Sequence, residues 1–224
     1  MRKKIIAGNW KMNKTVGESL ALIKELKPLL AGKDTADVVV CPPYTDLFSV
    51  GEALKNTNIA LGAQDVFWKS AGAYTSQVSA AMLTDVGAKY VIIGHSETRG
   101  RFGVPEPDAT EDMVRFYGES DATVNLKVKA ALMAGLVPIV CVGETSQERQ
   151  AGEIDAVVHR QTTQALQGVD GARVGSEVIF AYEPVWAIGT GAVCAADEAD
   201  RVCGLVRAAV ADSFGQPVAD VIRI

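Results

Sequence analysis

Residues 4–13 read KIIAGNWKMN, an apolar run followed by a polar turn, and this stretch decides between the two folds that the chain allows. The run KIIAG is continuous rather than alternating, which is typical of a strand buried on both faces. A dinucleotide-binding sheet would place G-x-G-x-x-G directly after its first strand. Here the turn holds one glycine, Gly8, and offers a lysine and two amides instead. The stretch therefore favours a closed (β/α) barrel over a doubly wound sheet.

Strand and helix patterns alternate along the rest of the chain. Further apolar runs of strand length occupy residues 36–41, 58–63, 90–94, 137–142 and 178–182, and a seventh begins at residues 221–224. Helix patterns occupy residues 17–30, 80–86, 121–134, 146–166 with a break at Gly152, and 197–214. Asp121 is expected to cap the third of these helices. Because no linker divides the chain, we expect a single domain over residues 1–224 with parallel strands covered by helices.

Composition excludes several classes of protein. The chain has 224 residues, 48% of them hydrophobic and 22% charged, with a net charge of −5, which is typical of a globular protein rather than a disordered one. No basic run stands out, so we expect no nucleic-acid partner. No apolar stretch approaches the roughly 18–20 residues of a membrane helix, and the N-terminal apolar run is too short for a signal peptide. These features predict a cytoplasmic protein with no membrane partner.

The cysteines are widely spaced and lie far from the histidines in sequence. They are Cys41, Cys141, Cys194 and Cys203. Without paired cysteines or a neighbouring histidine, a structural zinc site is not expected. We interpret the four as reduced thiols, most of them buried.

Polar side chains follow the ends of three predicted strands. The first strand is followed by Asn9 and Lys11, the fourth by His95, Ser96 and Glu97, and the sixth by Glu183. In a (β/α) barrel such ends converge at one mouth, where catalytic residues lie. A carboxylate acts as a proton base, an imidazole polarises a carbonyl, and a lysine stabilises developing negative charge. The set predicts cofactor-free proton transfer next to a carbonyl. Schiff-base chemistry at Lys11 is the alternative, ranked second because this lysine lies in a polar turn.

At these residues the sequence resembles the triosephosphate isomerases, from one end to the other. The matching stretches are residues 7–13 (AGNWKMN), 39–43 (VVCPP), 62–66 (GAQDV), 94–97 (GHSE), 141–144 (CVGE) and 181–191 (AYEPVWAIGTG). The resemblance implies the (β/α)8 TIM-barrel fold. It also implies an isomerase, without metal or cofactor, that interconverts dihydroxyacetone phosphate and D-glyceraldehyde 3-phosphate through an enediol, in glycolysis and gluconeogenesis.

The resemblance further implies roles for the strand-end residues. Glu183 corresponds to the base that moves a proton between adjacent carbons, and His95 to the neutral electrophile that polarises the carbonyl. Lys11 and Asn9 correspond to the residues that position the substrate and stabilise its charge.

Three more roles come from the same resemblance. Glu97 is similar to the carboxylate that holds the lysine, and Ser96 to the partner of the base in the open state. Residues 184–191 resemble a closing lid, in which Gly189 would offer its backbone N–H to the substrate phosphate. The lid would exclude water, so that the enediolate is reprotonated rather than losing phosphate.

A loop bounded by Gln64 and Gln77 resembles the family's dimer loop, with Thr75 as its matching tip residue. A homodimer of triose phosphate-binding chains is therefore expected, and a higher oligomer is an open alternative. The aromatic residues of this loop would by themselves indicate only an adhesive surface.

One departure from the family pattern follows the fourth strand. Val104 and Gly118 bound what looks like an insertion, and Thr98 replaces a usual arginine. We expect the insertion to be a surface excursion, with a role in assembly or in gating the mouth as the alternative.

The second departure concerns the end of the chain. The family pattern continues beyond Ile224 with phosphate-binding loops and an eighth βα unit, which are expected to be lacking here. A different hypothesis follows, namely a weakly active or inactive scaffold that associates through open sheet edges. Another phosphate-sugar enzyme on the same barrel is a third, less favoured reading.

Overall fold

The computed structural model of the chain describes residues 2–224, apart from the side chains of Phe116 and Tyr117. It divides into two compact units. The first consists of Met1–Ile93 and Lys129–Pro138, and the second of Gly94–Val128 and Ile139–Ile224. The expectation of a single domain stays a prediction.

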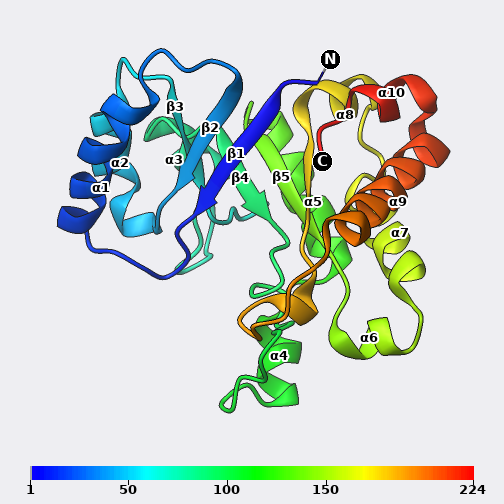
Figure 1. Ribbon diagram of the computed structural model, residues 1–224. Helices are drawn as coiled ribbons and strands as arrows, with labels where there is room; N and C mark the ends of the chain where they lie inside the picture. The colour runs from blue at the N-terminus through cyan, green and yellow to red at the C-terminus, as the bar shows by residue number, and fades with distance from the viewer. Residues whose placement is uncertain (1) are drawn as a thin grey trace. The chain divides into compact units, whose positions relative to one another are not determined.

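The first unit is a parallel ladder of strands with helices between them (Figure 1). Its elements are β1 (Lys4–Asn9), α1 (Val16–Leu30), β2 (Ala36–Cys41), η1 (Tyr44–Asp46), α2 (Leu47–Leu54), β3 (Ile59–Ala63), α3 (Ala80–Asp85) and β4 (Tyr90–Ile93). β1 pairs with β2, β2 with β3 and β3 with β4, all parallel. The register places Asn9 opposite Cys41, so the turns that follow these strands leave the ladder at the same edge.

The second unit has the same alternation (Figure 1). Its elements are α4 (Glu111–Tyr117), α6 (Ser146–Gln150), α7 (Ile154–Ala165), α8 (Gly171–Glu177), β6 (Ile179–Tyr182), η2 (Val185–Ala187), α9 (Ala196–Phe214) and α10 (Gln216–Val221). Two further elements, α5 (Asp121–Met133) and β5 (Val137–Val142), have residues in both units. β5 and β6 pair in parallel from Ile139 opposite Ile179 to Val142 opposite Tyr182.

The predicted strands and helices agree with the structure to within a residue or two at most ends. The continuous apolar runs of β2, β3, β5 and β6 supply the buried core, including Val39, Leu61, Val140 and Phe180. Gly152 separates α6 from α7 at a positive φ of 75°, as the predicted break requires. The four cysteines are free thiols, two buried and two half-buried. None of the helices within residues 2–224 combines the length and apolarity needed to cross a membrane.

The expectation that every apolar strand is buried on both faces is wrong for β1. Its residues are mostly exposed or half-buried, and Ile6 is 63% exposed. Within its unit β1 pairs with β2 alone, so one side of this strand has no neighbour there.

The prediction that Asp121 caps α5 is also wrong. The cap of α5 is Ser120, whose hydroxyl accepts the N–H of Thr123 at 3.2 Å, whereas the Asp121 carboxylate binds Arg99 and Arg160 instead. Cationic partners thus outcompete the backbone for this carboxylate.

The seventh strand predicted at residues 221–224 is reduced to one bridge. Val221 ends α10, and only Arg223 pairs, with Ile179. Phe180 N–H donates to the Arg223 carbonyl at 3.0 Å. Pro217 lies in the first turn of α10, a position that favours helix initiation, and this helix includes Val221, the first residue assigned to the strand.

Residues 104–118 contain a helix that periodicity did not indicate. α4 begins after Thr110, whose hydroxyl accepts the N–H of Met113 at 3.3 Å. Val114 of this helix packs against Gly100, and the Gly118 N–H donates to the Val114 carbonyl at 2.8 Å. The status of this segment as an insertion stays a prediction.

Candidate active site

Two predicted site residues meet in the second unit. His95 follows β4 and Glu183 follows β6, and His95 Nε2 lies 3.0 Å from Glu183 Oε1. The backbone N–H of Ser96 donates to the other carboxylate oxygen, Oε2, at 3.0 Å. Both side chains of the pair are largely buried. The structure therefore brings together His95, Ser96 and Glu183, three of the residues that strand ends predicted.

The hydrogen bonds of the imidazole define its protonation. Glu97 N–H donates to His95 Nδ1 at 3.2 Å, so Nδ1 is an acceptor and carries no proton. The single ring proton is then on Nε2, which donates toward Glu183. The Glu97 carboxylate lies 3.6 Å from Nδ1, at the rim of the same turn. His95 is accordingly a neutral hydrogen-bond donor that points at a carboxylate.

A tight hydrogen-bonded turn holds His95 in place. The N–H groups of Arg99, Gly100 and Arg101 donate to the carbonyls of His95, Glu97 and Ser96 at 3.0, 3.2 and 2.8 Å. The buried Arg99 guanidinium donates to the Gly94 carbonyl at 2.7 Å and to Asp121 at 2.6 Å. The turn is thereby fixed to β4 at one end and to α5 at the other.

Glu183 is held by a close approach between β5 and β6. Its N–H donates to the Val142 carbonyl at 2.8 Å, and a side chain at Gly143 would overlap the Glu183 backbone. Burial raises the pKa of the neighbouring Cys141 thiol well above its usual value, and the Glu183 carboxylate raises it further. Cys141 therefore stays protonated, and its thiol is available to donate to Glu183.

The segment predicted to form a lid, residues 184–191, is hydrogen-bonded to a buried carboxylate. Glu144 accepts hydrogen bonds from the Trp186 indole at 2.7 Å and from the Tyr182 hydroxyl at 3.1 Å. Arg149 stacks its guanidinium 4.6 Å from the centre of the Trp186 ring. Desolvation raises the pKa of Tyr182, and Glu144 raises it further. Sequence reasoning did not assign roles to these residues, although they lie within the motifs CVGE and AYEPVW.

The tip of the lid is exposed and turns through two glycines. Gly189 and Gly191 adopt φ values of 73° and 79°, which only glycine takes without strain. The Thr190 hydroxyl donates to the Trp186 carbonyl at 3.0 Å and accepts the Ala192 N–H at 3.1 Å. Gly189 is thus placed in a short, internally bonded loop.

The other two predicted site residues, Asn9 and Lys11, lie in the first unit. Asn9 Oδ1 accepts the Lys11 N–H at 3.0 Å, and Lys11 has a φ of 53°, an uncommon conformation for a residue with a side chain. Gln64 Nε2 donates to the carbonyls of Lys11 and Cys41, both at 2.9 Å. Sequence reasoning placed Gln64 only at the end of a loop, and its support of the lysine turn was missed. Strained backbone of this kind concentrates at functional sites.

The loop from Gln64 to Gln77 is built around aromatic rings. Phe67 stacks on Trp68 and Tyr74, with ring centres 4.0 and 4.9 Å away. Thr75 is exposed at its tip.

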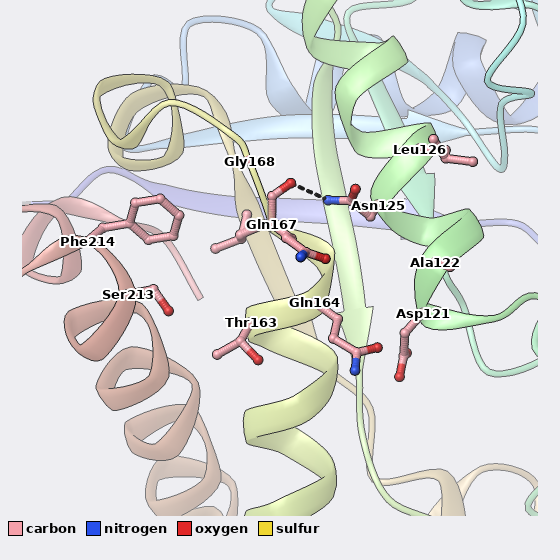
Figure 2. A pocket seen from close by; sticks show the side chains of 11 residues that line it. Asp121, Ala122, Asn125, Leu126, Thr163, Gln164, Gln167, Gly168, Ser213 and Phe214 are labelled. Carbon is pink, nitrogen blue, oxygen red and sulfur yellow. Dashed lines mark hydrogen bonds between the residues drawn. The ribbon is translucent and has the colours of Figure 1, made fainter.

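A cavity of about 860 Å³ lies away from these residues, between α5, α7 and α9 (Figure 2). Its polar lining is already engaged, since Asn125 donates to the carbonyls of Ala165 and Gln167 at 2.9 and 3.0 Å. Asp121, at one edge, is paired with two arginines. The residues that line this cavity include no pair of acid and base side chains like His95 and Glu183.

Comparison with known proteins gives consistent matches. The sequence model of a family described as "Triosephosphate isomerase" matches residues 4–224. The chain is 49% identical over 224 residues to a triosephosphate isomerase of Citrifermentans bemidjiense, covering 100% of this chain and 83% of that protein. It is 47% identical over 214 residues to one of Synechocystis sp., covering 95% and 81%. A crystal structure of triosephosphate isomerase from Bartonella henselae is similar with a TM-score of 0.80 at 34% identity, covering 98% of this chain and 81% of that one.

Proposed function

The chain belongs to the triosephosphate isomerase family and has its TIM-barrel fold, and from this membership we propose that it interconverts dihydroxyacetone phosphate and D-glyceraldehyde 3-phosphate. One observation carries the proposal. A carboxylate, Glu183, lies 3.0 Å from the protonated nitrogen of a neutral imidazole, His95. Proton transfer next to a carbonyl needs this combination of a base and an uncharged hydrogen-bond donor.

In the proposed reaction Glu183 removes a proton from the carbon next to the substrate carbonyl. His95 Nε2 donates its proton in a hydrogen bond to the carbonyl oxygen, where negative charge develops as the enediolate forms. A proton must also pass from the neighbouring hydroxyl to this oxygen, and His95 relays it by giving its Nε2 proton to the first oxygen and taking the proton of the second. The protonated Glu183 then returns its proton to the neighbouring carbon as the second oxygen becomes the carbonyl, so the aldose and ketose differ only in where hydrogen is bound. Both Glu183 oxygens are engaged here, by Ser96 N–H and by His95, so substrate must replace at least one of these contacts.

The remaining site residues take supporting roles in this proposal. Lys11 stabilises the developing negative charge and Asn9 positions the substrate, with Glu97 holding the lysine. Gly189 offers its backbone N–H to the phosphate when the lid closes. Closure excludes water, so the enediolate is reprotonated before the bond to phosphate breaks. The internally bonded loop around Gly189 supports this role, because it presents a short glycine turn.

We propose a homodimer formed through the loop from Gln64 to Gln77, with Thr75 inserted into the partner. The exposed, aromatic-braced loop supports this assignment. Sedimentation of the chain as a monomer at micromolar concentration would contradict it. Because triose phosphates are intermediates of glycolysis, we also propose a cytoplasmic location.

Isomerisation of glyceraldehyde 3-phosphate tests the function directly. Glu183→Gln keeps the side-chain shape but removes the base, and we expect kcat to fall by about 10²–10⁴-fold. Glu25→Gln, an exposed carboxylate on α1, is the matched control and is expected to keep the parent rate. Failure of the unmodified chain to isomerise the substrate would overturn the function, and a fully active Glu183→Gln would overturn the assignment of the base.

A further inference from the structure

We propose that Gly103 and Val104 are positioning residues that seat the lid, residues 184–191, against the turn that carries His95. The inference rests on the proposed isomerase function and adds to it a contact at the back of the lid. All of the contacts that carry it lie within the second unit.

Gly103 lies directly against the backbone of the lid. A Cβ at this position would fall inside contact distance of the carbonyl oxygens of Val185 and Ile188, and 3.2 Å from the Ile188 carbonyl carbon. Both carbonyls belong to the lid, and backbone atoms have no rotamer with which to move aside. The residue therefore has to be glycine for the lid to take its present position.

Val104 supports the second half of the lid. Its Cγ2 lies 3.6 Å from the position that a Cβ of Gly189 would occupy, so this methyl faces the side of Gly189 that has no side chain. Gly189 is the residue whose N–H we assign to the phosphate. The valine methyl thus limits how far Gly189 can move toward Val104.

Residues 101–104, which contact the lid, are hydrogen-bonded to the turn that carries His95. Arg101, two residues before Gly103, donates its N–H to the Ser96 carbonyl at 2.8 Å and its guanidinium to the Gly143 carbonyl at 3.1 Å. The same guanidinium is paired with Glu148. Residues 101–104 consequently connect Ser96, which holds the base, to the lid.

The residues that follow this segment also contact the turn that carries His95. Val114 of α4 fills the space beside Gly100, and the Glu119 N–H donates to the Thr98 carbonyl at 2.9 Å. The Thr98 hydroxyl donates to the Glu119 carboxylate at 2.8 Å. Residues 104–118 are therefore attached near both ends to the turn that carries His95.

Two substitutions separate a positioning role from a merely structural one. Gly103→Ala forces the lid backbone to move, and misplacement by about 1 Å costs up to about 10²-fold in rate, so we expect kcat to fall at least about tenfold.

Val104→Ala removes the support behind Gly189, and we expect several-fold more of the enediolate to lose phosphate. That loss breaks the C–O bond to phosphate and yields methylglyoxal and inorganic phosphate, which are measured directly. Val104→Ile, which keeps a branched aliphatic side chain at this position, should show the same partition as the parent protein.

The controls are matched in chemistry. Gly204→Ala on α9 adds a methyl where no atom lies within 4 Å, and Val16→Ala on α1 truncates another partly exposed valine. Both should keep the parent kinetics and partition.

The ¹⁹F resonance of 5-fluorotryptophan at position 186, assigned with Trp186→Phe, reports the environment of the lid without catalysis. It should shift in Gly103→Ala and Val104→Ala only.

Parent kinetics, parent partition and an unshifted Trp186 resonance in Val104→Ala would overturn the proposal, even if Gly103→Ala does not fold. An inactive parent chain would instead count against the isomerase function, and the Trp186 resonance would still decide whether Gly103 and Val104 seat the lid.

Discussion

Replacing Gly143 with alanine perturbs the site at the point where β5 and β6 come closest. A Cβ at this position would lie 2.7 Å from the carbonyl carbon of Glu183 and 3.3 Å from its Cα, with the carbonyl oxygen nearer still. The opposing atoms are backbone, so no side-chain rotation relieves the overlap. The substitution must push the backbone of the proposed base away from its partner strand.

The size of that displacement follows from the same contacts. Ordinary van der Waals contact to a Cβ begins near 3.4 Å, so the Glu183 carbonyl carbon must move by about 0.7 Å and the nearer carbonyl oxygen by more than about 1 Å. The Glu183 N–H···O bond to Val142, 2.8 Å long, resists this movement. A misplacement of about 1 Å in a catalytic group costs about 10²-fold in rate, and overpacking of this kind costs about 1–3 kcal/mol of stability. We therefore expect kcat to fall by about 10–100-fold.

Steady-state kinetics in both directions, with urea unfolding on the same preparations, measure the two effects separately. The Gly204→Ala control should match the parent protein in both. If Gly143→Ala retained kcat within about threefold and the same free energy of unfolding, the close approach of β5 and β6 would not determine where the base lies. A loss of stability with an unchanged kcat would also refute the reasoning, because the base would have kept its place.

Three further predictions concern single polar groups. Ser19→Ala removes the hydroxyl that donates to the buried Asp46 carboxylate at 2.5 Å, and should lower the free energy of unfolding by about 1–3 kcal/mol in urea titrations. Hydrogen bonding from Arg201 lowers the pKa of Glu198 from 4.5 to about 2, so this carboxylate stabilises the fold above pH 4.5 and loses that contribution as the pH falls toward 2. Glu198→Gln should therefore cost up to about 1 kcal/mol at pH 7 and flatten the decline of the urea midpoint over this acid range. Ser96→Ala should keep kcat within about threefold without lowering the melting temperature, because the Ser96 hydroxyl is buried without a hydrogen-bond partner among residues 2–224 and the N–H that holds Glu183 remains.

The strands were predictable because burial on both faces leaves a signature in consecutive residues. Val137–Val142 and Ala36–Cys41 have in the structure the bounds that the apolar runs indicate. Short helices leave no such signature. α8 begins where Asp170 accepts the Ala172 N–H at 3.0 Å and contains one buried side chain, Val174, too few for an apolar stripe. α4 and α10 escaped prediction for the same reason, and the expected seventh strand is reduced to the bridge at Arg223.

Side-chain chemistry was predictable at the site, whereas the groups that orient it were not. His95 and Glu183 were predicted as site residues because an imidazole and a carboxylate occur together with a lysine at the ends of separate strands. Their orientation depends on the backbone N–H groups of Ser96 and Glu97, at 3.0 and 3.2 Å. Every residue except proline carries an N–H, so no residue type marks these donors in a sequence.

The difference between side-chain and main-chain contacts also explains why glycines matter so much to this site. Gly143 admits the backbone of Glu183, and Gly103 admits the backbone of the lid. In each case the essential property is the absence of a side chain, so that one main chain can lie against another. A motif such as CVGE therefore carries two kinds of information, since Glu144 binds Trp186 through its carboxylate while Gly143 acts by leaving space. If the rates of the Gly103→Ala and Gly143→Ala variants both fall while Ser96→Ala stays active, the positions of the base and the lid are set by main-chain packing rather than by neighbouring side chains.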